Sequence, residues 1–401
     1  DVTLVRNGND VTIVIAESAA GAGDGGSVLL KNNLDDYYYQ GVEKITFANG
    51  TTWTRAVLRA MLVNYAGTSG NDTITGFNVA DVITAGAGND TITAGDGNDT
   101  LDGEAGNDIL DGGSGDDTHI GGEGDDLLIG NVGADTFDGG NGVDTLDFTY
   151  YTANHSINLD TGLVTFSDGT TEQILNIENA IGGAGNNVMQ GSSANNRLEG
   201  RDGNDALSGG AGNDVLNGGN GTDSHFGGDG DDLLIGNVGA DTFDGGNGVD
   251  TLDFTYYTAN HIIDLAANRV IFSDGTFEEA LNIENAIAGS GNNELRGSSA
   301  NNRLDGGSGN DMLTGGQGSD TFVFAANFGK DTISDFQVGA ASDDIIDLKS
   351  NVFADFASVL AAATQVGTDT LITYDANNSI LLKNVALANL HQDDFRFTAA
   401  T

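Results

Sequence analysis

Aspartate recurs at one fixed interval along much of this chain. Residues 67 to 147 divide into nine consecutive nonapeptides without an insertion, and the sixth position of each is Asp. Carboxylate oxygens are ligands that Ca²⁺ prefers, so a regular series of carboxylates predicts a series of calcium sites. The nine residues are Asp72, Asp81, Asp90, Asp99, Asp108, Asp117, Asp126, Asp135 and Asp144.

Each nonapeptide predicts a turn followed by a very short strand. Its first six residues are rich in Gly, which permits positive φ and close backbone approach, and its last three alternate in direction. The eighth residue, usually Ile, Leu or Phe, should point inward. Two nonapeptides would close one coil, which stacks repeats n and n+2 on the same side. We expect one calcium ion between such repeats, held by two Asp carboxylates and by backbone carbonyls of the turns. The turn glycines assigned to these sites are Gly113, Gly122, Gly140, Gly210, Gly219, Gly228 and Gly246.

Two further arrays and two inserts follow. Eight nonapeptides occupy residues 182–253, and four occupy residues 288–323. The inserts, residues 148–181 and 254–287, are near copies of each other, so a whole unit was duplicated. We expect a β cap at residues 1–66, three rolls at 67–147, 182–253 and 288–323 with the inserts breaking the roll between them, and a C-terminal cap with the export signal at 324–401. The later position-six aspartates are Asp205, Asp214, Asp223, Asp232, Asp241, Asp250, Asp311 and Asp320.

The repeat follows the pattern GGxGxDxUx, where U is a large apolar residue, as in GGSGDDTHI and GGEGDDLLI. On this motif the chain resembles the RTX (repeats-in-toxin) haemolysin-type calcium-binding proteins. The resemblance implies an all-β fold of right-handed parallel β-rolls with β-rich inserts and caps. Residues 41–62 resemble the calcium-binding-related β domain that precedes such arrays. Residues from 318 onward resemble the C-terminal region of type I secretion substrates, which implies export by that machinery to the extracellular space or cell surface.

Calcium would also explain the charge of the chain. Against 60 acidic residues stand 14 basic ones, which gives a formal net charge of −46. Pairing position six of repeats n and n+2 gives seven Asp–Asp sites in the first array and four in the second. Eleven to fifteen Ca²⁺ are expected, and fifteen would bring the net charge to about −16. Four pairs contain Asn and should be weaker or empty: those of Asn187, Asn196, Asn293 and Asn302.

Several classes of protein are excluded or disfavoured. A chain this acidic would be repelled by nucleic acid, and no apolar run approaches the ~18 residues of a membrane-spanning helix. The chain has no Cys for disulfides or thiolate metal sites, and the motifs HExxH and GxSxG are absent. Without Pro it has no Asp-Pro bond for self-cleavage, and we predict no catalytic residues. Because it begins Asp-Val-Thr without Met or a leader, we expect a fragment lacking an amino-terminal signal peptide, with any enzymatic domain upstream.

The leading hypothesis is a secreted calcium-binding module that folds on calcium after type I export and serves as a folding and spacer element of an adhesin, surface-layer or matrix protein. One alternative is the non-catalytic C-terminal part of an exoenzyme acting on polysaccharide or lipid. Another is a carbohydrate-binding face on the inserts, for which packing of the strands is the favoured explanation. The partners expected are calcium, the secretion machinery and a glycan, cell-surface or matrix partner. The insert residues are Tyr150, Tyr151 and His155, with copies Tyr256, Tyr257 and His261.

Aromatic residues outside the inserts predict packing more than chemistry. His119 and His225 occupy the inward eighth position and should stack on Phe137 and Phe243, two repeats later. Trp53 is expected in the core of the amino-terminal cap. Short helices are expected near residues 54–62 and 356–363, and the cluster of residues 37–39, Tyr-Tyr-Tyr, is assigned to a turn or a glycan contact.

Overall fold

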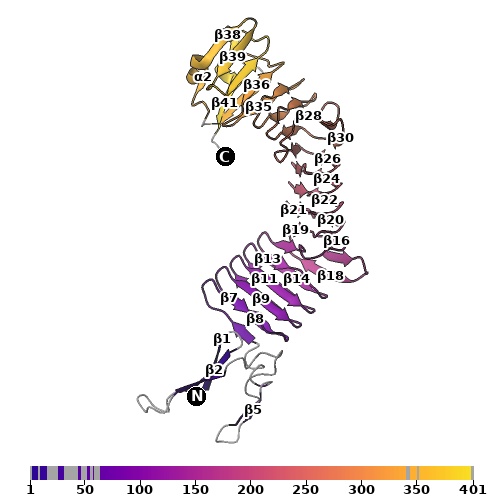
Figure 1. Ribbon diagram of the computed structural model, residues 1–401, viewed down its shortest axis with the longest axis vertical. Coiled ribbons are helices and arrows are strands. Elements are labelled where there is room, and N and C mark those ends of the chain that lie inside the picture. Colours follow the sequence, from indigo (N-terminus) through magenta and orange to yellow (C-terminus); the bar gives the residue numbers. More distant parts are fainter. Residues whose placement is uncertain are drawn as a thin grey trace. The chain divides into compact units, whose positions relative to one another are not determined.

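Figure 1 shows a computed structural model that describes residues 2–7, 10–15, 26–30, 44–46, 52–54, 57, 64–339, 344–349 and 352–398. The chain forms two compact units whose boundary falls within the first insert. Unit 1 consists of residues 1–150, 162–164 and 168–177, and unit 2 consists of residues 151–161, 165–167 and 178–401. In each unit the repeats form short strands that stack as parallel rungs, because the repeats bring one strand every nine residues.

Unit 1 begins with two small antiparallel sheets. β1 (Val2–Asn7), β2 (Asp10–Ile15) and β3 (Gly26–Leu30) pair in that order, and β4 (Lys44–Thr46) pairs with β5 (Thr52–Thr54). Trp53 is half-buried in β5 opposite Ile45, so it contributes to strand packing. The expected helix at 54–62 lies outside the described residues except for residues 54 and 57, and the tyrosines at 37–39 lie outside them entirely.

The first nonapeptide array forms a parallel β-roll with strands on two sides. Each strand pairs with the strand 18 residues later, as in Leu110↔Leu128 and Leu101↔His119, which confirms the predicted stacking of repeats n and n+2. One side contains β6 (Asn64–Ala66), β8 (Val82–Thr84), β10 (Thr100–Ala105), β12 (Thr118–Glu123), β14 (Thr136–Asn141) and β18 (Thr171–Leu175). The other contains β7 (Thr73–Thr75), β9 (Thr91–Asp96), β11 (Ile109–Ser114), β13 (Leu127–Ile129) and β15 (Thr145–Asp147).

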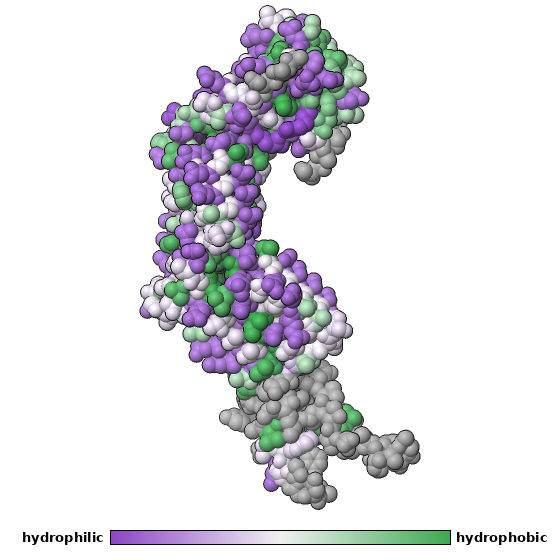
Figure 2. Space-filling view, turned by 180° about the vertical axis from the view of Figure 1, so that it is seen from behind, coloured by the Kyte–Doolittle hydropathy of each residue, from purple (hydrophilic) through white to green (hydrophobic). Residues whose placement is uncertain are grey.

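The core of each roll is a column of position-eight side chains. Ile92, Leu101 and Leu110 are fully buried, as inward alternation requires. His119 belongs to the same column, and its ring stacks on Phe137 with centroids 4.7 Å apart. His225 stacks on Phe243 at 4.8 Å, which confirms both histidines as buried aromatic packing residues. On the face seen in Figure 2, the surface of the rolls is mostly hydrophilic, with apolar residues scattered over it.

Unit 2 continues the same architecture over the second and third arrays. One side contains β16 (His155–Asn158), β20 (Val188–Gln190), β22 (Ala206–Ala211), β24 (Ser224–Asp229), β26 (Thr242–Asn247), β32 (Glu294–Arg296), β34 (Met312–Thr314) and β36 (Lys330–Ile333). The other contains β19 (Asn179–Ile181), β21 (Arg197–Glu199), β23 (Val215–Asn217), β25 (Leu233–Ile235), β27 (Thr251–Asp253), β31 (Asn285–Ile287), β33 (Arg303–Asp305), β35 (Thr321–Phe324) and β37 (Ile345–Lys349). β17 (Leu163–Phe166) has residues in both units.

The second insert does not interrupt the roll, and the expectation that it would is wrong. β28 (His261–Asp264), β29 (Arg269–Phe272) and β30 (Phe277–Leu281) form an antiparallel meander. β30 pairs in parallel with β26, and β28 pairs in parallel with β32. β27 pairs directly with β31, so both sides continue. The insert preserves the roll because its strands keep the register of the strands that they replace.

The C-terminal end covers the last coil. Helix α2 (Phe356–Ala362), near the predicted position, begins at Asp355, whose carboxylate accepts the N–H of Ser358 in a capping box. β38 (Ala363–Val366), β39 (Asp369–Thr373) and β40 (Ser379–Leu382) form an antiparallel sheet that joins β36, while β41 (Phe395–Thr398) adds to β37. The 3₁₀ turns are η1 (Leu387–Asn389) and η2 (Gln392–Asp394). No helix in the described part of the chain has the length and apolarity needed to cross a bilayer.

Candidate metal centre

The position-six aspartates form a regular series of hydrogen bonds, here called the ladder. The backbone N–H of position six in repeat n donates to Oδ1 of position six in repeat n+2, as from Asp108 to Asp126 at 2.7 Å. All seven Asp–Asp pairs expected in the first array and all four in the second are joined in this way, at 2.6 to 2.9 Å. The structure therefore brings together every carboxylate pair that the sequence matched.

These carboxylates are buried, and the ladder uses only one of their two oxygens. Every position-six Asp is at most 2% exposed except Asp72, which is half-buried. In thirteen of them Oδ2 is buried without a hydrogen-bond partner among the described residues. A buried anionic oxygen without a donor or cation is strongly unfavourable, so the series has the chemistry of metal ligands. These residues are Asp90, Asp99, Asp108, Asp117, Asp126, Asp135, Asp205, Asp214, Asp223, Asp232, Asp241, Asp250 and Asp311.

Backbone oxygens converge on the same places. A β-carbon added to Gly103, at position one of its repeat, would lie 2.3 Å from Oδ2 of Asp108 and 2.6 Å from the carbonyl oxygen of Gly121. The same arrangement recurs at Gly227, with Asp232 at 2.3 Å. Gly103 and Gly227 thus each leave a space lined by a carboxylate oxygen without a hydrogen-bond partner and a carbonyl oxygen of the next coil. The hard-oxygen donor set fits Ca²⁺.

The position-two glycines permit the close stacking of successive turns. All seven that the sequence assigned to sites have positive φ, between 90° and 118°. A β-carbon on Gly228 would lie 2.0 Å from the carbonyl oxygen of Gly210, so no other residue fits without displacing backbone. These glycines place the turn carbonyls, whereas the position-one glycines leave room beside Oδ2. The role of Gly at position one, where Ala85, Ala94 and Ala288 stand in three of the repeats, was not predicted from the sequence.

Burial raises the pKa of the position-six carboxyl groups, because the charged form loses its hydration. The ladder N–H opposes this shift, and repulsion from neighbouring carboxylates adds to it in many repeats, as Asp117 and Asp81 do for Asp99. The pKa rises to about 7 for Asp99, Asp126, Asp135, Asp205 and Asp311, and to about 6 for Asp214, Asp241, Asp250 and Asp320. These buried anions require protons or cations to compensate their charge.

The Asn-bearing repeats differ from the Asp-bearing repeats in the side-chain atom that takes the place of Oδ2. Asn196 and Asn302 keep the ladder bond, since their N–H groups donate to Asp214 and Asp320 at 2.7 and 2.9 Å. Their side-chain Nδ2, however, donates at 2.6 Å to the carbonyl oxygen of the residue 18 positions earlier, Glu178 or Glu284. An amide N–H₂ brings no charge and occupies a backbone acceptor.

The structure adds two carboxylates to the ladder beyond the recognised repeats. Asp331 accepts the N–H of Asp311 at 2.8 Å, and Asp344 accepts that of Asp320 at 3.1 Å. Both are buried, and burial raises the pKa of Asp331 to about 8. They were missed because their spacings of 20 and 24 residues break the period of 18. The available signal was an Asp directly before Thr-Ile or Ile-Ile, in KDTI and DIIDL.

Side-chain clusters of another kind are not found in the described regions. No group of three or more His, Cys, Asp and Glu side chains there is arranged to hold a metal. His119 and His225 accept the N–H groups of Gly112 and Gly218 at Nε2, and burial lowers the pKa of each imidazole to about 4, so both are neutral packing groups.

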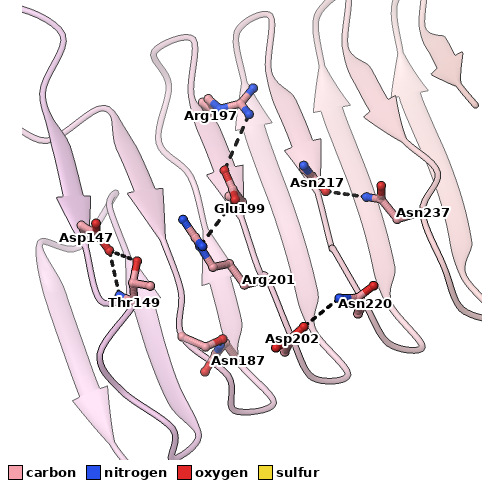
Figure 3. A network of polar contacts seen from close by, with 11 residues as sticks. Asp147, Thr149, Asn187, Arg197, Glu199, Arg201, Asp202, Asn217, Asn220 and Asn237 are labelled. Atoms are coloured by element: carbon pink, nitrogen blue, oxygen red, sulfur yellow. Dashed lines mark hydrogen bonds and ion pairs between the residues drawn. The ribbon is translucent and has the colours of Figure 1, made fainter. Parts of the chain in front are cut away.

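The duplicated aromatic residues of the second insert separate into a packed pair and an exposed ring. Tyr257 packs against His261, with ring centroids 5.9 Å apart, and its hydroxyl donates to the carbonyl oxygen of Asn237 at 2.5 Å. Tyr256 is 76% exposed beside an open groove of about 570 Å³. Figure 3 shows polar residues that line this groove: Asn220 donates to Asp202, and Asn237 donates to Asn217. Glu199 forms ion pairs with Arg197 and Arg201, of which Arg201 lines the groove.

Comparison with known proteins gives three family matches. The RTX calcium-binding nonapeptide repeat matches residues 64–92, 76–110, 84–119, 111–146, 181–216 and 217–252. The serralysin C-terminal domain of peptidase family M10 matches residues 242–400, and the haemolysin-type calcium binding protein related domain matches residues 20–57. No curated protein sequence matches the chain.

Among solved structures, the extracellular lipase LipA from Serratia marcescens is similar to part of the chain. It is 19% identical over 52% of this chain, with a TM-score of 0.24, and the chain spans 39% of the lipase. Proteins that carry RTX repeats are secreted, and the repeats and serralysin-type C-terminal domain are non-catalytic regions of such proteins. Because the repeat family matches both long arrays and the two other families match the flanking segments, the chain belongs to the RTX calcium-binding proteins.

Proposed function

We propose that the position-six carboxylates hold a series of calcium ions, and that binding these ions drives folding of the chain after export. The observation that carries this proposal is the row of buried Oδ2 atoms without partners, several of which lie beside a position-one glycine and a backbone carbonyl oxygen. Each ion would compensate the negative charge of two carboxylates and would be coordinated by carbonyl oxygens of two coils. Eleven to fifteen ions follow from the repeat pairs, and Asp331 and Asp344 extend the series.

Calcium would decide whether the chain folds, because the charge opposes folding without it. A formal net charge of −46 destabilises a compact state, and burial of the carboxylates increases that cost. With a Kd of about 10⁻⁴ M, millimolar calcium would stabilise the fold by about 1.4 kcal/mol per site, on the order of 15 kcal/mol for eleven sites. At the low calcium concentration of a cell interior, this stabilisation nearly vanishes.

This dependence suits a chain that is exported unfolded through a type I secretion machinery. The chain would remain extended inside the cell and fold on reaching calcium outside. In the folded state, the stacked coils would act as a spacer within an extracellular adhesin, surface-layer or matrix protein. The duplicated arrays support this role, since repetition lengthens a roll without requiring a new core.

Calcium titration of the full chain tests the proposal. Far-ultraviolet circular dichroism in excess EGTA should show a largely unfolded chain, and added calcium should restore β structure in a cooperative transition. Magnesium at the same concentration is the control and should be much less effective, because it requires rigid octahedral geometry and retains its waters. Full β structure in EGTA at neutral pH would rule the proposal out.

A second candidate is the non-catalytic C-terminal part of a secreted exoenzyme. The match of residues 242–400 to a serralysin C-terminal domain favours this arrangement, in which the rolls help a preceding catalytic domain to fold. The sequence encoded immediately upstream of Asp1 distinguishes the two candidates. A catalytic domain there would support the exoenzyme, and further repeats or adhesive domains would support the spacer.

A third candidate is glycan binding by the second insert. The exposed ring of Tyr256 beside Arg201, Asp202 and Asn220 combines an apolar face with hydrogen-bonding groups, as carbohydrate recognition requires. A glycan array on the calcium-loaded chain tests it, with Tyr256→Ala and Tyr150→Ala as variants. Binding that is absent, or that neither substitution changes, would reject this candidate.

A further inference from the structure

Both inserts place a glutamate in the row of position-six aspartates. In the second insert, Thr242 of β26 pairs with Glu279 of β30. Glu278 therefore lies on the coil next to Asp241, where the position-six residue of repeat n+2 would lie. In the first insert, Thr136 of β14 pairs with Gln173 of β18, which puts Glu172 after Asp135. Neither glutamate belongs to a nonapeptide, so the repeat pattern gives no reason to expect one there.

Glu172 and Glu278 have the surroundings expected of metal-binding carboxylates. Glu172 and Glu278 are 2% and 3% exposed, and both carboxylate oxygens of each are buried without a hydrogen-bond partner. Oδ2 of Asp135 and of Asp241 is equally without a partner, so each pair presents three such oxygens. Burial, with the charge of the neighbouring aspartate, raises the pKa of each glutamate to about 8. The backbone N–H of Asp135 or Asp241 opposes this shift but is outweighed by burial and by the neighbouring charge.

A third glutamate, Glu284, accepts a hydrogen bond of the ladder type on the other side of the roll, where β27 pairs with β31. Thr251 of β27 pairs with Asn285 of β31, and Oε2 of Glu284 accepts the N–H of Asp250 at 3.0 Å, the bond that an aspartate makes elsewhere. The insert also supplies the carbonyl. A β-carbon on Gly245 would lie 2.2 Å from the carbonyl oxygen of Asn282 and 2.5 Å from Oδ2 of Asp250. The carboxylate, carbonyl and glycine of a repeat site are therefore all present.

We propose that the inserts complete three further calcium sites, formed by Asp135 with Glu172, Asp241 with Glu278, and Asp250 with Glu284. This inference rests on the proposed function, because it requires that the position-six aspartates bind calcium. Each Glu replaces the Asp of repeat n+2. The inserts would then carry the rows of ions beyond the last repeat of each array, and their folding would depend on calcium as that of the repeats does.

Counting ions on the full chain by native mass spectrometry in calcium tests the inference. Glu172→Gln, Glu278→Gln and Glu284→Gln keep the shape of the side chain and remove its charge. Each should lower the maximum count by one ion, and the triple variant should lower it by three. Glu279→Gln is the matched control, because Glu279 is exposed next to Glu278, and it should keep the full count. A triple variant that binds as many ions as the unmodified chain would overturn the inference.

Two further measurements separate this outcome from simpler ones. Asp223→Asn removes a carboxylate that two repeat sites share. The proposed function itself is refuted if the unmodified chain binds no calcium. The slope of unfolding free energy against the logarithm of calcium concentration reports how many ions are bound on folding. For each Gln variant this slope should correspond to one ion fewer. In EGTA at low pH, where Glu278 is protonated, Glu278→Gln should be about as stable as the unmodified chain, because neither side chain carries a charge. If Glu278→Gln destabilises equally with and without calcium, the residue is structural and the inference fails.

Discussion

The backbone N–H of Asp108 donates a hydrogen bond of 2.7 Å to Oδ1 of Asp126, eighteen residues along the chain, and Oδ2 of Asp126 has no hydrogen-bond partner. One oxygen therefore fixes the stacking of two coils, and the other remains available for a cation. Repetition of this relationship explains how one residue type can set both the register and the calcium requirement of the fold.

The chelated chain should recover structure on acidification. Burial raises the pKa of at least nine position-six carboxyls to about 6 or 7, against 3.8 in the unfolded chain. The folded state thus binds more protons between these values, and its stability decreases as pH rises through them. His119 and His225, with pKa lowered to about 4, act in the opposite direction below about pH 6.5, but they are only two groups.

The test is far-ultraviolet circular dichroism in EGTA from about pH 8 to about pH 5. β structure should increase as pH decreases, and calcium should then add less to it because protons compete for the carboxylates. A chelated chain that loses structure steadily over this range would contradict the raised pKa values.

Substitution of a position-two glycine should be costlier than that of a loop glycine with a similar backbone. Gly228→Ala puts a β-carbon 2.0 Å from the carbonyl oxygen of Gly210, whereas Gly275, at φ 88°, has open space around it. Gly275→Ala should cost roughly 1–2 kcal/mol, the penalty for a left-handed Ala. Gly228→Ala should cost at least twice that and weaken calcium binding. Thermal unfolding in calcium measures both, and equal losses would contradict the stacking argument.

Restoring a carboxylate at an Asn-bearing repeat should create a calcium site. Asn302→Asp replaces the Nδ2 that donates to the carbonyl oxygen of Glu284 with an anionic oxygen. We expect one additional ion and a higher melting temperature in calcium, but lower stability in EGTA. Asn301→Asp is the control, since Asn301 is exposed and its Oδ1 acceptor is preserved. Isothermal titration calorimetry should show no additional ion for the control, and the same result for Asn302→Asp would refute the prediction.

Asp347 should hold the last strand independently of calcium. Its Oδ2 accepts hydrogen bonds from Arg303 and Arg396 at 3.1 and 3.0 Å, and its Oδ1 accepts one from Thr398. Burial raises the pKa of Asp347, but these bonds outweigh burial and leave that pKa below its usual value. The stabilisation is therefore present above about pH 4 and is lost as pH decreases through the folded pKa.

Asp347→Asn should destabilise β41 by about 1–3 kcal/mol, the range for losing a charged hydrogen-bond acceptor. Hydrogen exchange of the amides in Phe395–Thr398 is the measurement, in saturating calcium. Asp393→Asn, at an exposed position, should change the exchange by little. Unchanged protection in Asp347→Asn would show that β41 is held by its backbone pairing alone.

The repeats could be read from the sequence because their physics is local and periodic. The inward position-eight residues, the pairing of repeats 18 residues apart and the stacked pair His119 and Phe137 all follow from alternation and a constant period. Where the period is interrupted, this reasoning stops. Asp331 and Asp344 join the ladder at other spacings, and Glu284 joins after a meander whose register only the folded sheet defines. The same limit explains why the second insert was wrongly expected to interrupt the roll.

The most direct test of the calcium ladder is a crystal structure of the calcium-loaded chain with an anomalous difference map recorded for calcium. The account predicts a peak beside each position-one glycine that faces a position-six Oδ2, such as that between Gly103 and Asp108, within bonding distance of the carboxylate and the turn carbonyls. Peaks should be weaker or absent at Asn196 and Asn302. A fully folded chain grown in calcium without anomalous peaks at the Asp–Asp pairs would contradict the account.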